Sequence, residues 1–400
     1  DIYCLFYELG WQLLRPSGLL CFITSNKWMR AGYGENTRFF LSDKTNPRLL
    51  IDFSGVKVFD SATVDTNILL FEKSPNTHDT LCAVTSGQSR DVINNLGVYV
   101  QRQGTVCGFA GPDAWVVLSP IEQSIKRKIE SVGKPLREWD IKIFRGVLTG
   151  YNDAFIITTE RRNEILSNCK TDEERQRTEE IIRPILRGRD IKRYSYDWAG
   201  LWLIATFPSK HYDIEQYPAV KQHLLSFGKE RLEQSGKEYI INGEKVKARK
   251  KTNNQWFETQ DSISYWEDFL QPKIVWAELA RTGNAFVLDL KGNMVGNTGY
   301  ILTVPNNDYD VLMYLLAFLN SRSMLYSLNQ ITTRFDNNGW RWLRQFVEEL
   351  RVPPLVGKED ILKIVNGTTK ENQKERSETI DCVIAKIYNF TPDEIQYINS

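Results

Sequence analysis

The stretch LLCFITSNKWMRAGYGENTRFFL, residues 19 to 41, predicts a buried strand that ends in a polar loop and is followed by a helix. Residues 19–24 form an unbroken apolar run of strand length. The run stops at residues 25–28, Ser-Asn-Lys-Trp, where an amide, a cation and a large aromatic ring come together. Open α/β sheets place their ligands at the carboxyl ends of strands, so these groups predict a site there.

Working outward, the first 75 residues alternate helix and strand. Residues 1–14 carry apolar side chains at intervals of three and four, which predicts a helix, and residues 49–53 and 66–72 are further buried strands. Apolar strands alternating with helices predict an α/β domain whose sheet is covered on both faces. Three strands are too few for an independent domain of this kind. Because Asp1 already lies within helix-like sequence, we expect a fragment of a larger protein, with the other strands upstream.

The remainder predicts an α+β domain followed by a helical tail. We expect strands near residues 201–205, 273–278, 285–289 and 300–304, one apolar helix over 309–329, and an exposed polar excursion over 228–262. Weak strands, LCAVTS and GVYVQRQ, are expected in a connector. The predicted division is residues 1–76, α/β; 77–112, connector; 113–355, α+β; and 356–400, helical tail.

Composition restricts the class of protein. At 400 residues and 46.4 kDa the chain is expected to hold two or three domains, and no apolar run approaches the roughly 20 residues of a membrane helix. The six cysteines contain no CxxC pair and the three histidines have no partners at ligand spacing. Reduced thiols in a cytoplasmic protein, without a disulfide framework or a zinc site, are therefore expected.

Two basic segments favour a nucleic-acid partner. The net charge is only +1, but residues 183–193 hold five cations against one acid, and residues 245–251 hold five cations and no acid. Aromatic residues stand beside both segments. Such a mixture suits a polyanion, although a solvated basic loop is the commoner explanation of a single charge run.

The order of several motifs resembles a known family. The motifs are DIYCLFYELGWQLLRPSGLLCFITSNKWMRAGYGENTRFFL, VFDSATVDTNILLFEKS, GVLTGYNDAFII, IIRPILRGRDIKRY, KIVWAELART and YLLAFLNSRSMLYSL. Together, over nearly the whole chain, they resemble the C-terminal part of the bacterial N6-adenine DNA methyltransferases of type IIG restriction-modification enzymes, which carry a TaqI-like specificity domain. The resemblance implies half of a Rossmann-like methyltransferase sheet, residues 1–76, and a target-recognition domain, residues 113–355.

The resemblance also implies roles at the end of the first strand. Asn26 and Lys27 would lie at the cleft edge near the cofactor or the DNA backbone, with Trp28 packing the following loop. Phe59 matches by position the aromatic residue that contacts an adenine flipped out of the duplex, and Lys57 would be a phosphate contact. The alternatives are that Asn26 caps the strand end and that Trp28 and Phe59 are core residues.

The catalytic motifs of that family are absent. Its Asn-Pro-Pro-Tyr-like tetrapeptide has no counterpart, since residues 352–355, Val-Pro-Pro-Leu, lack both the amide and the aromatic ring. The glycine-rich loop for S-adenosylmethionine is also missing. Residues 140–142 and 190–192 match the Asp-x-Lys of a nuclease site but read as surface pairs. We therefore expect no catalytic residue and no metal in this chain, with Mg²⁺ required only if the parent protein carries a nuclease domain.

Double-stranded DNA is the partner that the resemblance implies. The expected phosphate contacts are Arg187, Arg189, Lys192, Arg193 and Lys250. The expected base-reading residues are Arg145, Tyr151, Asn152, Arg281, Arg334 and Arg341, with Asn337 or Asn338 as further candidates. For two segments a structural turn is the alternative: RGVLTGYN, which contains two glycines, and the Asn-Gly pair before Trp340.

Two other functions are compatible with the sequence. One is a stand-alone DNA-recognition or interaction module without an enzymatic parent, and the other is an RNA-modifying methyltransferase on the same scaffold. An Asn-Pro-Pro-Tyr motif upstream would separate the first from the methyltransferase.

Overall fold

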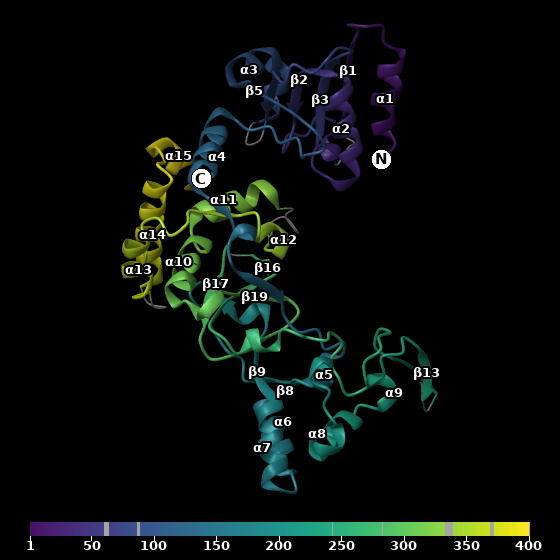
Figure 1. The fold of residues 1–400 in the computed structure, drawn as a ribbon. Coiled ribbons are helices and arrows are strands. Elements are labelled where there is room, and N and C mark those ends of the chain that lie inside the picture. Colours follow the sequence, from purple (N-terminus) through teal and green to yellow (C-terminus); the bar gives the residue numbers. More distant parts are fainter. Residues whose placement is uncertain are drawn as a thin grey trace. The chain divides into compact units, whose positions relative to one another are not determined.

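A computed structural model of the chain describes residues 1–59, 64–85, 89–241, 243–281, 283–332, 339–368 and 372–399. The chain divides into two compact units, residues 1–127 and 128–400 (Figure 1). The boundary falls inside a helix, α4 (Pro120–Val132). The segment predicted to be a connector therefore belongs structurally to the first unit.

The first unit is built on a five-stranded sheet. Its helices are α1 (Tyr3–Leu13), α2 (Glu35–Lys44) and α3 (Leu96–Gln103), and its strands are β1 (Leu19–Ser25), β2 (Asn46–Asp52), β3 (Thr66–Glu72), β4 (Thr80–Val84) and β5 (Thr105–Cys107). The strand order is β1-β3-β2-β4-β5. Strands β2 and β4 are parallel, whereas β3 runs antiparallel to both of its neighbours.

Helices cover both faces of this sheet. Leu50 of β2 belongs to a core cluster with Tyr7 of α1 and Leu41 of α2. The next residue, Ile51, points to the opposite face and packs in a cluster with Val100 of α3. Because successive strand side chains alternate between faces, the apolar run in β2 fills two cores. The prediction of an α/β sheet covered on both faces is confirmed for β2. The prediction that residues 19–24 are a buried strand is wrong, because β1 lies at the edge of the sheet and has no buried residue, with Leu19 57% and Ile23 42% exposed.

Two details of the first unit differ from the sequence predictions. The sheet is mixed, because β3 pairs antiparallel with β1 and β2 whereas β2 and β4 are parallel. The predicted strand GVYVQRQ is wrong, since these residues form α3. Its apolar residues have helical spacing, and Tyr99 donates a hydrogen bond to the carbonyl oxygen of Val84 at 2.7 Å.

The second unit contains most of the helices and strands. Its helices beyond α4 are α5 (Asn152–Phe155), α6 (Thr159–Ser167), α7 (Asp172–Ile181), α8 (Pro218–Leu225), α9 (Lys229–Leu232), α10 (Tyr309–Leu319), α11 (Arg322–Ile331), α12 (Arg344–Val347), α13 (Lys358–Val365), α14 (Gln373–Ile387) and α15 (Pro392–Asn399). Its main strands are β7 (Lys142–Arg145), β8 (Ile156–Thr158), β9 (Ile182–Leu186), β12 (Leu201–Ile204), β15 (Lys273–Ala277), β17 (Phe286–Asp289), β18 (Met294–Val295) and β19 (Gly299–Thr303). Its short strands are β6 (Lys134–Pro135), β10 (Ile191–Lys192), β11 (Ser195–Tyr196), β13 (Glu238–Ile241), β14 (Glu244–Lys247), β16 (Leu279–Ala280), β20 (Trp340–Arg341) and β21 (Arg351–Val352).

Two four-stranded sheets share one core in this unit. Their orders are β17-β15-β19-β7 and β18-β9-β12-β8. Every residue of β15 and of β19 is buried. Val275 of β15 and Leu203 of β12 belong to the same apolar cluster. The strands predicted over residues 201–205, 273–278, 285–289 and 300–304 are confirmed, each within two residues at its ends.

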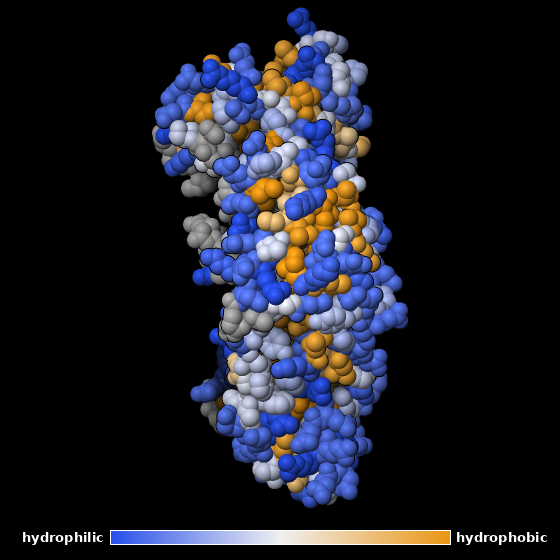
Figure 2. Space-filling view, turned by 90° about the vertical axis from the view of Figure 1, so that its left-hand side faces the viewer, coloured by the Kyte–Doolittle hydropathy of each residue, from blue (hydrophilic) through white to orange (hydrophobic). Residues whose placement is uncertain are grey.

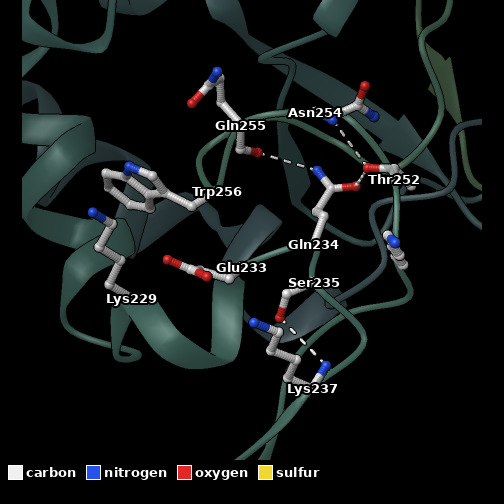
Figure 3. Close-up of a pocket in the computed structure, with 10 residues that line it drawn as sticks. Lys229, Glu233, Gln234, Ser235, Lys237, Thr252, Asn254, Gln255 and Trp256 are labelled. Atoms are coloured by element: carbon white, nitrogen blue, oxygen red, sulfur yellow. Dashed lines mark hydrogen bonds between the residues drawn. The ribbon is translucent and has the colours of Figure 1, made fainter.

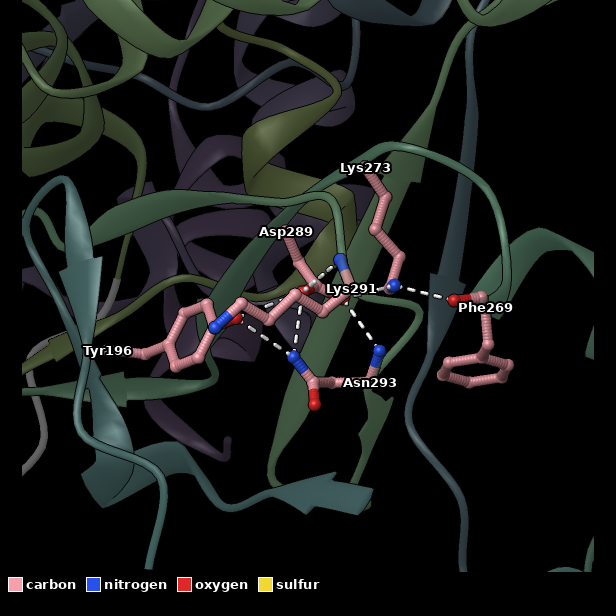
Figure 4. Close-up of polar contacts among 6 residues, drawn as sticks. All are labelled: Tyr196, Phe269, Lys273, Asp289, Lys291 and Asn293. Carbon is pink, nitrogen blue, oxygen red and sulfur yellow. Dashed lines mark hydrogen bonds and ion pairs between the residues drawn. The ribbon is translucent and has the colours of Figure 1, made fainter. Parts of the chain in front are cut away.

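A buried ion pair lies at one end of this core (Figure 4). Lys273 and Asp289 stand opposite each other on β15 and β17, both side chains are fully buried, and Lys273 Nζ lies 2.5 Å from Asp289 Oδ2. Lys273 also donates to the carbonyl oxygen of Phe269 at 2.6 Å. Asp289 accepts hydrogen bonds from the Asn293 amide at 2.7 Å and from the Tyr196 hydroxyl at 3.3 Å. Burial lowers the pKa of Lys273, and the carboxylate of Asp289 opposes that shift.

The apolar helix predicted over residues 309–329 is two helices. α10 and α11 meet at a bend of 67°. Asn320 causes the break, because its buried side chain accepts from Phe286 N–H at 3.0 Å and donates to the Phe286 carbonyl at 2.9 Å. Ser321 then caps α11 by accepting from the N–H of Met324. The tail that follows forms α13, α14 and α15, and the prediction of a helical tail is confirmed.

No single helix in the described ranges is long and apolar enough to cross a membrane. Only the bent pair of α10 and α11 meets that test by length and composition, and the side chains of residues 312–319 are buried in the core. The face of the protein drawn in Figure 2 is mainly hydrophilic, with hydrophobic residues gathered in separate patches.

The prediction that residues 228–262 are an exposed excursion is partly wrong. Gln234, Arg249 and Phe257 are buried, as are the two residues that follow Phe257. Their polar side chains bind backbone carbonyl groups of the same segment and hold it against the core. The polar composition of residues 228–262 predicts exposure to solvent. In the structure several of these polar groups are instead buried and hydrogen-bonded to one another.

The buried pair makes a stability prediction. Replacing Asp289 with Asn should lower the free energy of unfolding by about 3–5 kcal/mol, because Lys273 would keep its charge without a carboxylate. Urea unfolding of the whole chain, followed by circular dichroism, measures the change. Replacing the exposed neighbour Lys291 with Met is the control and should change it by less than about 0.5 kcal/mol.

A double variant sharpens this test. Lys273→Met combined with Asp289→Leu removes both charges and should cost less than Asp289→Asn alone. An unfolding midpoint of the single variant equal to that of the wild type would show that the pair does not hold the two strands together.

Candidate nucleic-acid interface

The carboxyl ends of β1 and β2 meet in a polar network in the first unit. Ser25 Oγ accepts from the N–H of Lys27 at 3.4 Å and starts the short 3-10 helix Asn26–Met29. Asn26 Nδ2 donates to Asp52 Oδ1 at 2.8 Å, and Ser54 Oγ donates to the same oxygen at 2.8 Å. Asp52 is only 1% exposed. The amide of Asn26 thus fixes the end of β2 and is engaged inside the protein.

The two residues that follow Asn26 point in different directions. Lys27 is exposed. Trp28 is fully buried, with its ring 5.8 Å from that of Tyr7 and 5.2 Å from that of Trp115. A Cβ at Gly34 would lie 2.0 Å from the Trp28 carbonyl oxygen, so the loop after Trp28 packs tightly on it. Trp28 supports this edge from the core side, whereas Lys27 faces solvent.

Phe59 and Lys57 lie on the segment that leaves β2. Phe59 is 45% exposed, which disfavours the alternative that it is a core residue. Lys57 is exposed as well, and Val56 between them and β2 is buried. The network around Asp52 fixes the start of this segment. The predicted contacts of Phe59 with adenine and of Lys57 with phosphate remain predictions.

A second site is formed at one end of the β17-β15-β19-β7 sheet. Arg145 ends β7, and its guanidinium donates to the Asn297 carbonyl at 3.0 Å and to Glu278, just after β15, at 2.9 Å. The Arg145 side chain is 54% exposed. Gly188 packs against Thr298, where a Cβ would lie 3.2 Å from the Thr298 carbonyl oxygen. Segments far apart in the sequence therefore converge at this end.

Close backbone contacts at Gly146 and Gly188 allow these segments to converge. Gly146 donates its N–H to Gly299 at 2.8 Å, and Val147 pairs with Gly296 in an isolated bridge. A Cβ at Gly146 would lie 2.1 Å from the Gly296 carbonyl oxygen, so only glycine fits. Gly146 thus serves a close backbone approach directly after β7, whereas Gly150, with φ of +78°, has the left-handed backbone conformation that favours glycine.

Four arginines stand at or beside this end of the sheet, and we call them the basic edge: Arg145, Arg189, Arg281 and Arg341. Arg341 pairs with Leu279 between β20 and β16, and Arg281 directly follows β16. Arg189 is exposed and follows Gly188. The residues predicted from separate motifs are thus brought together. Arg334, Asn337 and Asn338 lie outside the described residues.

The basic run 183–193 divides into inward and outward cations. Arg187 forms a two-pronged contact with Asp190, at 3.0 and 2.8 Å, and this contact raises the pKa of Arg187. Arg193 donates to the carbonyl oxygen of Asn320. Arg189 and Lys192 are exposed, and Lys192 Nζ also donates to the carbonyl oxygen of Arg189 at 2.9 Å. The structure therefore assigns Arg187 and Arg193 internal contacts and leaves Arg189 and Lys192 at the surface.

The other predicted DNA contacts lie around the turn after Gly150. The Tyr151 hydroxyl accepts from Arg231 at 2.9 Å, and Asn152 Oδ1 accepts from Thr149 at 2.6 Å. Both side chains therefore contribute to the turn. Lys250 is exposed.

Arg249, which the basic run 245–251 includes, is buried and not a surface cation. Its guanidinium donates to carbonyl groups of Thr149, Leu232, Trp256 and Glu258. Burial lowers its pKa to about 10. Sequence reasoning missed this role, because an arginine in a run of lysines gives no sign of an internal partner.

The prediction that residues 190–192 form a surface pair is wrong for Asp190, which is only 4% exposed. Asp190 is bound to Arg187. Among the described residues no group of three or more His, Cys, Asp or Glu side chains could hold a metal ion.

Comparison with known proteins identifies relatives for both units. Residues 1–59 match the family described as Eco57I restriction-modification methylase, and residues 183–350 match the TaqI-like C-terminal specificity domain. The chain is 24% identical to the type II methyltransferase M.BstVI of Geobacillus stearothermophilus, with all of this chain and 69% of that protein covered. It is 24% identical to M.XhoI of Xanthomonas vasicola, with 88% of this chain and 62% of that protein covered.

A solved structure agrees with the fold. The type IIL restriction-modification enzyme MmeI, determined in complex with DNA, aligns over all of this chain and 52% of its own length, with a TM-score of 0.50 and 11% identity. The chain spans about two thirds of the length of its curated relatives and about half of this enzyme.

The close backbone approach at Gly146 leaves no room for a side chain at this position. Gly146→Ala should lower the free energy of unfolding by about 1–3 kcal/mol, because two backbone segments must separate. Gly296 faces it across the same bridge but has only ordinary contacts, 3.8 Å or longer, for an added Cβ. Gly296→Ala is therefore the matched control and should change stability by less than about 1 kcal/mol. Equal unfolding midpoints for both variants in urea would contradict this account.

Proposed function

We propose that this chain, which is related to the type II methyltransferases of restriction-modification systems, recognises double-stranded DNA within an adenine-specific DNA methyltransferase. The observation that carries the proposal is the basic edge, of which Arg189, Arg281 and Arg341 lie in the segment matched to a TaqI-like specificity domain. Arg145, Arg189, Arg281 and Arg341 come from four separate stretches of sequence and meet at one end of a rigid, fully buried pair of strands.

The geometry of the basic edge suits a duplex. Guanidinium groups bind phosphates and the acceptor edge of guanine through pairs of N–H bonds. Arg145 is held by Glu278 and the Asn297 carbonyl, so its guanidinium is oriented before any ligand arrives. Arg189 and Lys192 are exposed on the neighbouring loop and can contact phosphates without reading sequence.

The first unit has the features of a partner for a further catalytic segment. Strand β1 is at the edge of its sheet, with no pairing on its outer side among the described residues. Helix α1 exposes an apolar stripe: Ile2, Leu5, Phe6, Leu9 and Leu13 are each 50–80% exposed. The relatives are longer than this chain. We propose that the remainder of a methyltransferase domain extends the sheet at β1 and covers this stripe.

We propose that S-adenosylmethionine is held by the catalytic segment and not by the turns of this chain. Gly34 is required by its contact with the Trp28 carbonyl, and the acidic Glu35 begins α2, so the Gly32–Gly34 turn serves packing. When bound to the complete enzyme, the cofactor would supply the methyl group for N6 of adenine. This chain's part in that reaction is to hold the duplex and to present Phe59, from the segment fixed by Asp52, toward a flipped adenine.

Removing the outward cations should weaken DNA binding without affecting the fold. Arg189→Gln combined with Lys192→Gln should reduce affinity for all duplexes alike and lower the slope of log affinity against log salt by about one for every phosphate that is no longer neutralised. Fluorescence anisotropy of the whole chain with a randomised duplex pool at two salt concentrations measures both quantities. Lys363→Gln, in the exposed helix α13, is the control. Unchanged affinity and slope in the double variant would remove this loop from the interface.

Phe59 should matter for methyl transfer and not for duplex affinity. In the enzyme assembled with its catalytic segment, Phe59→Ala should reduce the methylation rate by about tenfold or more, because the extruded base loses a stacking partner. Methylation of a duplex by labelled cofactor, with binding measured separately, checks this. Phe39→Ala, on the exposed side of α2, is the matched control. Full activity of the Phe59 variant would make Phe59 a surface residue without a role in catalysis.

A further inference from the structure

A polar pocket in the second unit lies outside the basic edge (Figure 3). It has a volume of about 520 Å³ and is formed by α9, the turn that follows it and residues 251–256. Small-molecule sites typically have ~300–1,000 Å³. Figure 3 shows Lys229 and Trp256 together on one side, with Ser235 and Lys237 lying close to each other elsewhere on the wall.

Buried side chains hold the wall of the pocket in place. Gln234 is only 5% exposed, and its amide donates to the carbonyl groups of Gln255, Glu258 and Thr259 at 3.1–3.3 Å. Its amide oxygen accepts from Thr252 at 2.7 Å. One side chain thus connects the turn after α9 to the far wall.

The buried Arg249 supports the same wall from behind. It donates to the carbonyl of Leu232, the last residue of α9, at 2.8 Å and to that of Trp256 at 2.7 Å. Because both Gln234 and Arg249 are fully used in these contacts, the pocket is built before a ligand binds. A preformed site avoids the cost of ordering its parts on binding.

The charge of the pocket favours an anion. Three lysines and one glutamate line it, a net of +2. No ion pair joins Lys229, Lys237 or Lys251 to a carboxylate within the described part of the chain, and the carboxylate of Glu233 accepts from the Tyr239 hydroxyl at 3.1 Å. The ammonium groups of these lysines are therefore available for an anionic ligand.

Trp256 adds a flat apolar surface beside these cations. It is half-buried and packs edge-to-face on Phe257, with ring centroids 5.7 Å apart. Indole rings bind the faces of nucleobases by stacking. The side chain of Gln255, exposed at the rim, offers an amide that can donate to and accept from a base edge.

We propose that this pocket binds one nucleotide, with its base stacked on Trp256 and its phosphate among Lys229, Lys237 and Lys251. The nucleotide is either a free nucleoside monophosphate or a single unpaired nucleotide of a DNA strand. The second source rests on the proposed function, and the first does not. This site is separate from the adenine contact proposed for Phe59, which lies in the first unit.

The first experiment uses the whole chain and 2-aminopurine riboside 5′-monophosphate. Stacking on the indole should quench the probe's fluorescence in a saturable way. Lys237→Gln combined with Lys251→Gln should weaken binding by about tenfold or more, and Trp256→Leu should abolish the quenching. Lys245→Gln combined with Lys247→Gln removes the same charge from the adjacent hairpin, outside the pocket, and should leave binding unchanged. Circular dichroism and urea unfolding of each variant establish that it is folded.

The second experiment distinguishes the two sources. A duplex that carries one unpaired 2-aminopurine is compared with the same duplex fully paired and with the monophosphate. Quenching by the monophosphate assigns the pocket to a free nucleotide, and quenching only in the unpaired duplex assigns it to DNA. If inorganic phosphate competes equally well and Trp256→Leu has no effect, the pocket binds an anion only and the proposal is overturned. Absence of quenching with every probe also overturns it.

Failure of the nucleotide pocket is distinguishable from failure of the proposed DNA recognition. Anisotropy with a labelled, fully paired duplex reports the basic edge, and it should respond to Arg189→Gln with Lys192→Gln whatever the pocket binds. A chain that binds the paired duplex but quenches no probe would keep the proposed function and exclude the nucleotide pocket.

Discussion

The buried pair of Lys273 and Asp289 fixes the register on which the rest of the second unit depends. A charged ammonium and a carboxylate in the core are stable only when they meet each other and find further hydrogen bonds. These two do, through Phe269, Asn293 and Tyr196. A slip of one residue between β15 and β17 would separate the charges and turn every side chain of the strand to the other face. The ion pair of Lys273 and Asp289 thus favours the observed alignment of β15 and β17.

The register of β15 also determines where Glu278 lies, at the opposite end of the strand. Glu278 follows the strand directly and holds Arg145 at 2.9 Å. The same end of the sheet receives Gly188 and residues 295–299, whose backbone approaches Gly146 so closely that a side chain is excluded there. The position of the basic edge therefore follows from strand register and from two glycine contacts, rather than from the arginines themselves.

The sequence allowed most strands and the helical tail to be predicted, because apolar periodicity reports burial directly. Predictions failed where a single polar contact decided the structure. The side chain of Asn320 binds the backbone of Phe286 and breaks a helix whose apolar pattern continues across it. The mixed order of the first sheet depends on the pairing of β3 between β1 and β2, and such non-local pairing leaves no periodic signal in one sequence.

The functional residues were harder to predict for a related reason. A run of cations looks the same whether its members face solvent or backbone carbonyls. Arg187, Arg193 and Arg249 bind groups inside the protein, whereas Arg189 and Lys192 are exposed, Lys192 with one hydrogen bond to the carbonyl of Arg189. Arginine presents five N–H donors in a rigid fork and can satisfy several carbonyl groups at once, so it is suited to both environments. Gln234, which forms part of the pocket wall, is buried, although the sequence predicts that residues 228–262 are exposed to solvent.

This division of the cations explains how a chain of net charge +1 can present a locally basic surface. The inward arginines hydrogen-bond to a carboxylate or to carbonyl groups and thereby tie together the segments that carry the exposed cations. Phosphate contacts gain from fixed positions, because less side-chain and loop entropy is lost on binding. Rigid placement of a few cations, rather than a large excess of positive charge, is therefore the property that we expect to determine affinity. Specificity then depends on which guanidinium groups, oriented by carboxylates as Arg145 is by Glu278, reach base edges.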